Sequence, residues 1–307
     1  MMQALTTIDP TTPPERTTHF ISLGAGVQST VLYLMACRGL IRPAPYVNGD
    51  GGLIQPPVFA AVFADTGWEP QAVYDHLDWL ESLRLSIPIV RVSAGDLYAD
   101  TWDATPYGRV GYTDIPTYVY NPGGKLGIRK RQCTNQYKIR PIHAWVSKMI
   151  GRKPRARTPY ACQWLGITSD EWHRAKPSRA SWVSTAHPFL DLGWRRHDCL
   201  DWFAQQYPKR PLVKSACMGC PFHADRTWLQ MARQDPEGME RTIQLDDRLQ
   251  APERIALENG RGLPQYLHNS GRPLREVLAD LDRRDKMKIP LFDTDGFGNE
   301  CEGHCGV

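Results

Sequence analysis

The first clear pattern in the chain is an apolar run that leads through small residues into a helical repeat. His19 to Leu23 is typical of a strand, Gly24-Ala25-Gly26 of a tight turn, and the apolar positions after Gln28 of a helix. Glycine lets the backbone turn tightly and approach a ligand, and a helix N-terminus offers unpaired N–H groups and a positive dipole end. The pattern therefore predicts an anion-binding loop, whose expected contacts are Ser22, Gly24, Gly26, Gln28, Ser29 and Thr30.

Strands and helices continue to alternate after this loop. Pro57 to Ala64 predicts a buried strand, Val73, Leu77 and Leu80 mark the apolar face of a helix, and residues 87–92 predict a third strand. A βαβαβ order predicts an α/β fold, in which a parallel sheet is covered by helices on both faces.

Beyond residue 92 the pattern varies more. Residues 93–130 show no sustained period, which is typical of a lid or binding loop. A helix is expected around residues 136–149, a strand at 160–167 and a short edge strand at 187–190, and a mainly helical pattern follows from 226 to 281. We expect four parts: a disordered or frayed N-terminus at 1–18, an α/β domain at 19–225 with a lid at 93–130, a helical part at 226–292 and a Gly/Cys tail at 293–307.

Composition narrows the class of protein. A chain of 307 residues that is 41% hydrophobic and 23% charged belongs to the ordinary globular class. Its apolar stretches are shorter than a membrane span, and residues 1–18 lack the apolar centre of a signal peptide, so we expect a cytoplasmic protein. The net charge of +4 suits anionic ligands without demanding nucleic acid. Eight cysteines in such a chain favour metal, cluster or thiol chemistry over a disulfide framework.

Two common phosphate-binding motifs do not match the loop. A Walker A motif needs Lys and then Ser or Thr after its second glycine, whereas Val27 and Gln28 follow Gly26. A dinucleotide fingerprint needs a third glycine where Ser29 stands. Ligands of open parallel sheets lie beyond the carboxyl ends of the strands. That rim supplies further expected nucleotide contacts: Asp65, Thr66, Gly67, Gly166 and Ile167. An alternative role for Asp65 is to cap the following helix.

Cations gather in two places. Arg129 to Arg140 contains five of them within twelve positions, at the end of the expected lid. We expect Arg131 and Lys138 to bind a phosphate or sulfate there, with Arg174 as a further nucleotide contact. Residues 152–157 form a second basic group, which is typical of a solvated loop and alternatively of a polynucleotide contact.

The cysteines suggest three arrangements. Cys217-Met218-Gly219-Cys220 is a C-x2-C pair, which can hold one metal or cluster. With Cys133 and one tail cysteine it would hold an iron–sulfur cluster, and with Cys301 and Cys305 a structural zinc. In the third arrangement Cys301 is a reactive thiol on a tail that reaches a bound substrate.

Taken together, these motifs resemble the phosphoadenylyl-sulfate (PAPS) reductase family, within the N-type ATP pyrophosphatases. Residues 22–29 resemble that family's modified pyrophosphate loop, residues 63–67 its second-strand Asp-Thr-Gly, and residues 300–304 its C-terminal tail with a nucleophilic cysteine. Further matching segments are Arg131-Gln132-Cys133 with Lys138 and Pro141, Gly166-Ile167 with Asp170-Glu171 and Arg174, and the pair Cys217 and Cys220. The resemblance spans about residues 19 to 305 and implies an adenine nucleotide alpha hydrolase-like fold.

The resemblance implies thiol-dependent reduction of adenylyl sulfate or phosphoadenylyl sulfate. Arg131 and Lys138 would hold the sulfonate, Cys301 would attack its sulfur, and a thiol carrier such as thioredoxin would regenerate the enzyme. A 4Fe–4S cluster on Cys133, Cys217, Cys220 and Cys305 would be its cofactor, with zinc as the alternative.

The chain also departs from the family. Thr134 stands where cluster-bearing members have a second, tandem cysteine, and the tail carries the extra thiol Cys305. Two other functions therefore stay open. One is an ATP pyrophosphatase that adenylates an acceptor, nucleic acid included, for transfer from a sulfur donor. The other is a non-catalytic, zinc-stabilised nucleotide-binding module.

Overall fold

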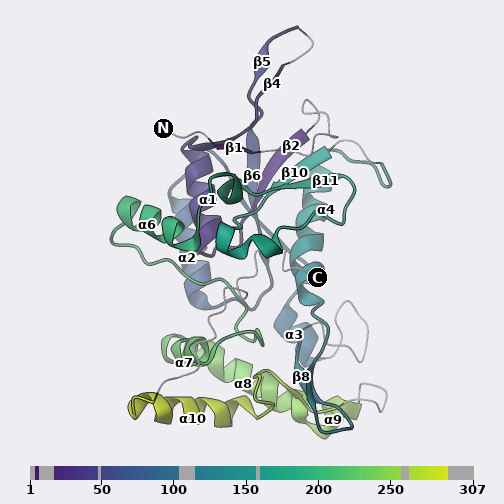
Figure 1. Ribbon diagram of the computed structural model, residues 1–307. Coiled ribbons are helices and arrows are strands. Elements are labelled where there is room, and N and C mark those ends of the chain that lie inside the picture. The colour runs from purple at the N-terminus through teal and green to yellow at the C-terminus, as the bar shows by residue number, and fades with distance from the viewer. Residues whose placement is uncertain are drawn as a thin grey trace.

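A five-stranded parallel sheet forms the upper half of the molecule (Figure 1). The computed structural model describes residues 4–6, 17–47, 50–103, 115–156, 160–256 and 263–289. The strand order is β11-β10-β2-β6-β7, and each neighbouring pair runs parallel. The strands are β2 (Thr17–Ser22), β6 (Val58–Asp65), β7 (Ile89–Ser93), β10 (Tyr160–Trp164) and β11 (Val183–Ala186). After β2 the chain adds β6 and β7 on one side of that strand, and it then crosses back to add β10 and β11 on the other side. This order is typical of Rossmann-like α/β folds.

Helices cover both faces of this sheet, as the alternating order of elements predicts. The helices of this half are α1 (Val27–Cys37), α2 (Gln71–Ser82), α4 (Arg140–Met149), α5 (Pro188–Asp191) and α6 (Arg196–Gln206). Side chains on one face of the sheet, such as Ile21 and Phe63, pack in one core with α1, α2 and α6. Side chains on the opposite face, such as Phe20 and Val62, pack with α4. Buried Val73, Leu77 and Leu80 confirm the apolar face expected for α2.

The lower half of the molecule is mainly helical, as the pattern after residue 226 predicts (Figure 1). It contains α7 (Asp225–Gln234), α8 (Pro236–Gln250), α9 (Pro252–Ala256) and α10 (Leu274–Lys286). None of the helices in the described ranges has the length and apolar character needed to cross a membrane.

Part of the expected lid belongs to this lower half and has regular structure. It contributes α3 (Leu97–Trp102) and the hairpin β8 (Tyr118–Tyr120) and β9 (Leu126–Ile128), while residues 104–114 lie outside the described chain. Strand β8 also pairs with β12 (Gln265–Tyr266), which comes from the C-terminal part. The expectation of an irregular segment at 93–130 was therefore wrong for its two ends. Each element there is too short to produce a recognisable period.

Two other short segments differ from expectation. Residues 187–190 do not form an edge strand, because Pro188 begins helix α5 and the edge strand is β11. At the N-terminus, β1 (Ala4–Thr6) pairs in parallel with β3 (Ile41–Pro43), so this part of 1–18 is ordered into a strand. The connection after β3 carries an antiparallel hairpin of β4 (Tyr46–Val47) and β5 (Leu53–Ile54), which projects from the top of the molecule (Figure 1).

A buried carboxylate joins the segments of the lower half. Asp246 on α8 is fully buried and accepts hydrogen bonds from the backbone N–H groups of Leu267 at 2.8 Å and Leu274 at 2.7 Å. Burial raises the pKa of Asp246 to about 6. The carboxylate therefore holds the start of α10 and the strand before it against α8.

Asp246→Ala should lower the free energy of unfolding by roughly 3 kcal/mol, because two buried N–H groups would lose their acceptor. Denaturant titration measures this change. The adjacent Asp247→Ala is the matched control, since that side chain is 48% exposed and pairs with Arg275 at the surface. Its effect should stay within about 0.5 kcal/mol. Equal losses for the two variants would contradict the role given to Asp246.

Candidate functional site

The loop between β2 and α1 lies at the carboxyl end of the central strand. Helix α1 begins at Val27 with Gly26 as its N-cap, and the Gly26 N–H donates to Ser29 Oγ at 3.2 Å. The left-handed backbone of the turn falls on Ala25, with φ of 59°, and not on a glycine. The reason given for Gly26 from the sequence was thus partly wrong, because its φ of −87° is open to any residue. Gly24 is the partly exposed residue of the otherwise buried loop, residues 22–30.

From the strand order, the crevice in which open α/β sheets bind ligands is expected between β2 and β10. Ligands of open α/β sheets bind at the topological switch point, where the connections of two neighbouring parallel strands run to opposite sides of the sheet. Here β2 and β10 are that pair. Gly166, just after β10, lies against the start of α1. A Cβ at Gly166 would be 2.9 Å from the backbone carbon of Gln28 and from the backbone nitrogen of Ser29. Only glycine allows this close approach without a shift of backbone atoms.

A buried polar network holds the side chain of Gln28 at this crevice. Its Nε2 donates to Glu171 Oε2 at 3.1 Å, and its Oε1 accepts from Arg196 Nη1 at 3.0 Å. Arg174 Nη1 donates to Glu171 Oε1 at 2.6 Å, and both of these side chains are buried. The hydroxyl of Thr168 is also buried and has no hydrogen-bond partner among the described residues. The carboxyl ends of β2 and β10 therefore combine fixed charges with the hydroxyl of Thr168, which can donate or accept a hydrogen bond.

Asp65, Thr66 and Gly67 lie at the carboxyl end of the neighbouring strand, as expected. Asp65 Oδ1 accepts from the Gly67 N–H at 2.8 Å and from the Tyr74 hydroxyl at 2.9 Å. Because α2 begins at Gln71 with Pro70 as its N-cap, the alternative role of Asp65 as the helix cap was wrong. Asp65 instead closes a tight turn that presents the backbone of Thr66 and Gly67 at the rim.

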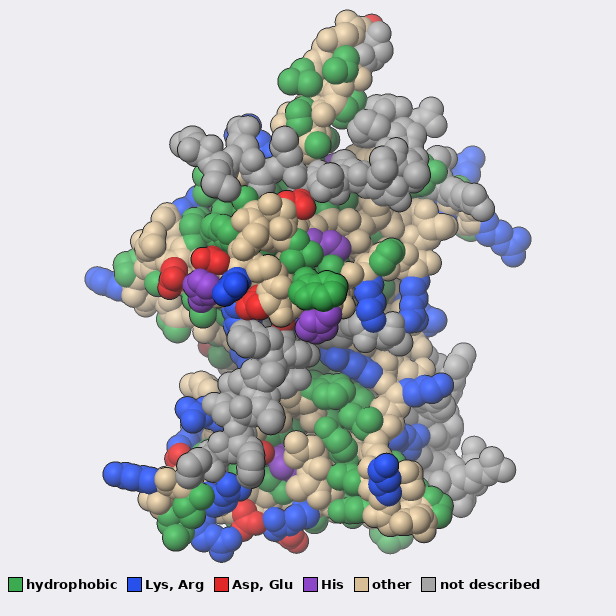
Figure 2. All heavy atoms as spheres, viewed as in Figure 1, with side chains coloured by type: hydrophobic (Ala, Val, Ile, Leu, Met, Phe, Trp, Pro, Cys, Tyr) green, Lys and Arg blue, Asp and Glu red, His purple; other side chains and the backbone are tan. Residues whose placement is uncertain are grey.

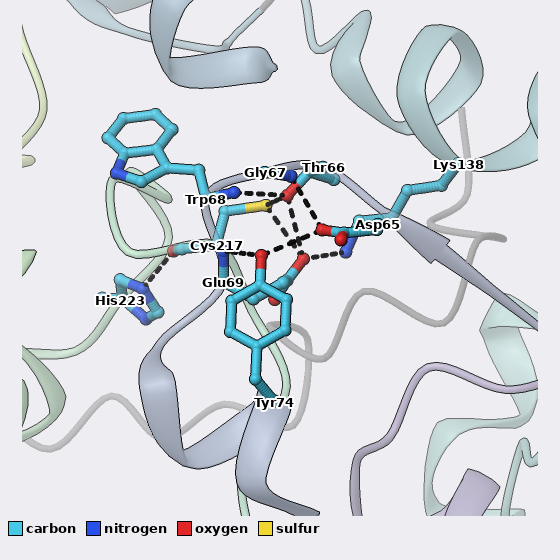
Figure 3. Close-up of polar contacts among 9 residues, drawn as sticks. All are labelled: Asp65, Thr66, Gly67, Trp68, Glu69, Tyr74, Lys138, Cys217 and His223. Atoms are coloured by element: carbon cyan, nitrogen blue, oxygen red, sulfur yellow. Dashed lines mark hydrogen bonds and ion pairs between the residues drawn. The ribbon is translucent and has the colours of Figure 1, made fainter. Parts of the chain in front are cut away.

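The segment after this turn leads to a second cluster of functional groups (Figure 3). Glu69 Oε1 accepts three hydrogen bonds, from Lys138 Nζ at 3.1 Å, Thr66 Oγ1 at 3.2 Å and Cys217 Sγ at 3.4 Å. The Glu69 side chain is fully buried, and its Oε2 has no partner in the described part of the chain. A buried acid, a buried amine and a thiol thus meet below the carboxyl end of β6.

The thiol of Cys217 is held in its protonated form in this arrangement. Burial, followed by the negative charge of Glu69, raises the pKa of Cys217 well above its ordinary value, and the charge of Lys138 only partly offsets this. The backbone carbonyl of Cys217 lies 2.9 Å from Nε2 of buried His223, whose pKa burial lowers to about 4. The neutral imidazole therefore donates to that carbonyl and fixes the start of the C-x2-C pair.

Three cysteines from distant parts of the sequence line one pocket. Cys133 approaches from the segment before α4, while Cys217 and Cys220 come from the loop before α7. Arg131 and Lys138 line the same pocket, together with Thr66, Trp68, Leu97, Ile115, Pro116, Gly219 and Pro221. The structure therefore brings together most of the predicted sulfur and anion ligands.

The pair of cysteines is packed tightly against the rim of the sheet. A Cβ at Gly219 would lie 1.9 Å from the Trp68 ring, so the glycine between the cysteines makes room for the indole. The Met218 N–H also donates to the Trp68 carbonyl at 2.9 Å. These contacts fix the loop of Cys217 and Cys220 beside the segment of Thr66 and Glu69.

Cys133, Cys217 and Cys220 are chemically suited to bind a metal, but the described residues do not form a complete metal site. Three soft sulfur donors face one pocket, yet within the described ranges no group of three His, Cys, Asp or Glu side chains is arranged to hold a metal ion. Cys301 and Cys305, the nucleophile and the fourth ligand expected from the sequence, lie outside the described residues. The ligand set of Cys133, Cys217, Cys220 and Cys305 therefore stays a prediction.

Two residues of the site were not expected from the sequence. Glu69 meets Lys138, 69 positions further along, and Arg196 meets Gln28, 168 positions earlier. The acidic position shortly after Asp65-Thr66-Gly67 was a signal for Glu69, whereas nothing in the pattern around Arg196 distinguishes it from a surface arginine. Comparisons with protein-family models, curated proteins and solved structures found no match. The class that the geometry defines is a Rossmann-like α/β fold.

Lower pH should destabilise the fold through three buried histidines. Burial lowers the pKa of His19, His76 and His223 to about 4, and His76 Nε2 lies 3.0 Å from Thr30 Oγ1 on α1. The unfolded chain takes up these protons first as the pH falls through 6.5, so stability is lost between pH 6.5 and 4. Asp246 acts in the opposite direction over pH 3.8 to 6, because its pKa is raised.

From pH 7 to pH 5 the free energy of unfolding should therefore fall by roughly 3–5 kcal/mol. Urea titrations at both pH values measure this. A variant with His76→Gln should lose less stability over this range, whereas His197→Gln, at a side chain that is 63% exposed, should lose as much as the wild type. Stability that rises on acidification would contradict the account.

Proposed function

We propose that the chain is an enzyme that binds an adenine nucleotide at the crevice between β2 and β10 and carries out sulfur chemistry in the cysteine pocket. One observation carries the proposal. Three cysteines and two cations line a single pocket, and that pocket includes Thr66 from the rim of the sheet. Residues 65–69 lead from the rim of the sheet, near which we propose that the phosphates bind, to the thiol of Cys217. Reduced thiols also favour a cytoplasmic location.

The first reaction we propose is thiol-dependent reduction of adenylyl sulfate or phosphoadenylyl sulfate, as the resemblance to PAPS reductases implies. The N-terminus of α1 would bind the phosphate, and Arg131 would bind the sulfonate. A thiolate, expected at Cys301, would attack the sulfur and form an S–S bond, and the adenosine phosphate would leave with the bridging oxygen. An external dithiol such as thioredoxin would then release sulfite, becoming a disulfide and restoring the cysteine.

A second reaction is favoured by the ion pair of Lys138. Its ammonium already neutralises the buried Glu69, which makes it a weaker partner for a sulfonate than the sequence predicts. In this reaction the α1 N-terminus binds the phosphates of ATP, and an acceptor oxygen attacks the α-phosphorus and releases pyrophosphate. A sulfur nucleophile brought through the cysteine pocket then displaces AMP.

Incubation with each nucleotide tests these proposals. Sulfite released from adenylyl sulfate in the presence of a dithiol supports the first reaction, and pyrophosphate released from ATP supports the second. Binding of both nucleotides without either product favours the non-catalytic nucleotide-binding module. Failure to bind either nucleotide at millimolar concentration would contradict the proposal as a whole.

The cysteine pocket should also bind iron. A 4Fe–4S cluster held there by cysteine thiolates would supply Lewis-acidic iron beside the anion. We expect iron and acid-labile sulfide in protein purified without oxygen, and their loss in Cys220→Ser. Zinc without labile sulfide would instead identify a structural site. Protein without either metal at full activity would contradict both ligand sets.

A further inference from the structure

One segment carries the whole positive excess of this chain. Residues 115–169 contain eleven Lys and Arg and no Asp or Glu. The full chain has 37 Lys and Arg against 33 Asp and Glu, so outside this segment 26 cations are outnumbered by the acids. The positive charges that give the chain its net charge of +4 are therefore concentrated in this one segment.

The segment lies along one side of the molecule, from α4 in the upper half to the β8–β9 hairpin in the lower half. Figure 2 shows Lys and Arg side chains down this side, without acidic side chains among them. We define the basic face by six of its exposed or half-exposed cations: Lys125, Arg129, Lys130, Arg140, Lys148 and Lys153.

Four lysines of the basic face have no acidic partner in the described ranges. Lys125, Lys130, Lys148 and Lys153 are exposed, and within the described residues none of them forms an ion pair with a carboxylate. By contrast, exposed arginines of the lower helices pair with neighbouring acids, as Arg233 does with Asp282. The described part of the chain therefore leaves the charges of these four lysines without an acidic partner.

The basic face borders the cysteine pocket. The same segment that carries the exposed lysines also supplies Arg131, Cys133 and Lys138 to the pocket lining. A single nucleotide bound at the crevice would need only a few of these cations. The others are placed for an anion that extends beyond the pocket along the surface.

We propose that the basic face binds the phosphate backbone of a nucleic acid strand that passes the cysteine pocket. Lysine is depleted in protein–protein interfaces, whereas phosphate backbones are bound mainly by Lys and Arg, so the composition favours nucleic acid over an acidic protein. The β8–β9 hairpin also exposes Tyr120, which is 41% accessible and is supported by the ring of Tyr266 at 6.1 Å. Exposed aromatic rings beside cations stack on the bases of single strands.

The inference goes beyond the proposed sulfur chemistry and can be tested without it. The probe is a labelled single-stranded 20-mer of DNA or RNA, with fluorescence anisotropy measured over a range of salt concentrations and without any nucleotide substrate. Binding should weaken with salt, with a slope of log K against log salt of about −3 or steeper. Loss of nucleotide binding in other experiments would leave this result unchanged.

The variant Lys125→Glu/Lys130→Glu/Lys148→Glu should weaken binding at least about tenfold at moderate salt and flatten the slope. The matched control, Arg84→Glu/Lys209→Glu/Lys288→Glu, makes the same change in net charge at exposed positions outside the segment. It should weaken binding less than about threefold. If the first variant does not fold, the three single changes should each reduce the slope by about one.

Three results would overturn the assignment. The first is absence of binding by the wild type at low salt. The second is an equal loss in both triple variants, which would reflect net charge alone. The third is displacement of the strand by polyglutamate as effectively as by an unlabelled strand of equal charge, which would identify an acidic protein as the partner.

Discussion

Gly166→Ala should weaken the binding of adenine nucleotides by about 10- to 100-fold. The new methyl group would lie 2.9 Å from the backbone of Gln28 and Ser29, where no side chain can move aside. The start of α1 would therefore shift, and its N–H groups would no longer converge on one phosphate position. Isothermal titration with ATP and with adenylyl sulfate measures the effect.

Gly123→Ala is the matched control for this change. It adds the same methyl group to a glycine of the β8–β9 hairpin that has no atom within 4 Å of the new position. Its nucleotide affinity should equal that of the wild type. Circular dichroism checks that both variants fold. Unchanged affinity in a folded Gly166→Ala protein would show that the crevice between β2 and β10 is not the nucleotide site.

Cys217→Ser and Cys220→Ser should each reduce the sulfur chemistry at least about 100-fold while leaving nucleotide binding within about threefold. Both thiols line the pocket, and both come from a loop fixed against Trp68 and His223. A hydroxyl in place of either sulfur removes a soft metal donor from the pocket. Product assays and titration calorimetry on the same preparations separate the two effects.

Cys37→Ser is the control for the pocket variants. Cys37 is the last residue of α1, is half-buried and does not line the pocket. The change should leave the product yield near that of the wild type. Full activity in both pocket variants, or equal loss in Cys37→Ser, would contradict the assignment of the chemistry to this pocket.

Four of the five strands of the central sheet could be predicted closely from the sequence, whereas the edge strand β11 was missed. Those four strands are short, continuous apolar runs, and the helices have apolar positions at helical spacing, so each period is visible along the chain. Strand β6 begins one residue after the predicted run and extends it to Asp65, and α1 begins at Val27. The segments with two or three paired residues could not be predicted, because pairing with distant partners decides their conformation.

The candidate site could be predicted only as separate pieces. The loop after β2, the turn after β6 and the C-x2-C pair each follow from local chemistry. The fold decides that these pieces lie together. Cys133 and Cys217 line one pocket because the segment after Cys133 packs beside β6. The partners of buried charges, such as Glu69 for Lys138, depend on the same long-range packing and leave no local pattern.

The central claim is that an adenine nucleotide and the cysteines share one site. A crystal structure of the chain with a bound ATP analogue or adenylyl sulfate tests it most directly. We expect phosphate oxygens within hydrogen-bond distance of the backbone N–H groups at the start of α1, and the anionic end of the ligand directed towards Thr66 and Cys217. A nucleotide bound elsewhere on the molecule, or with its phosphates turned away from the cysteine pocket, would contradict the account.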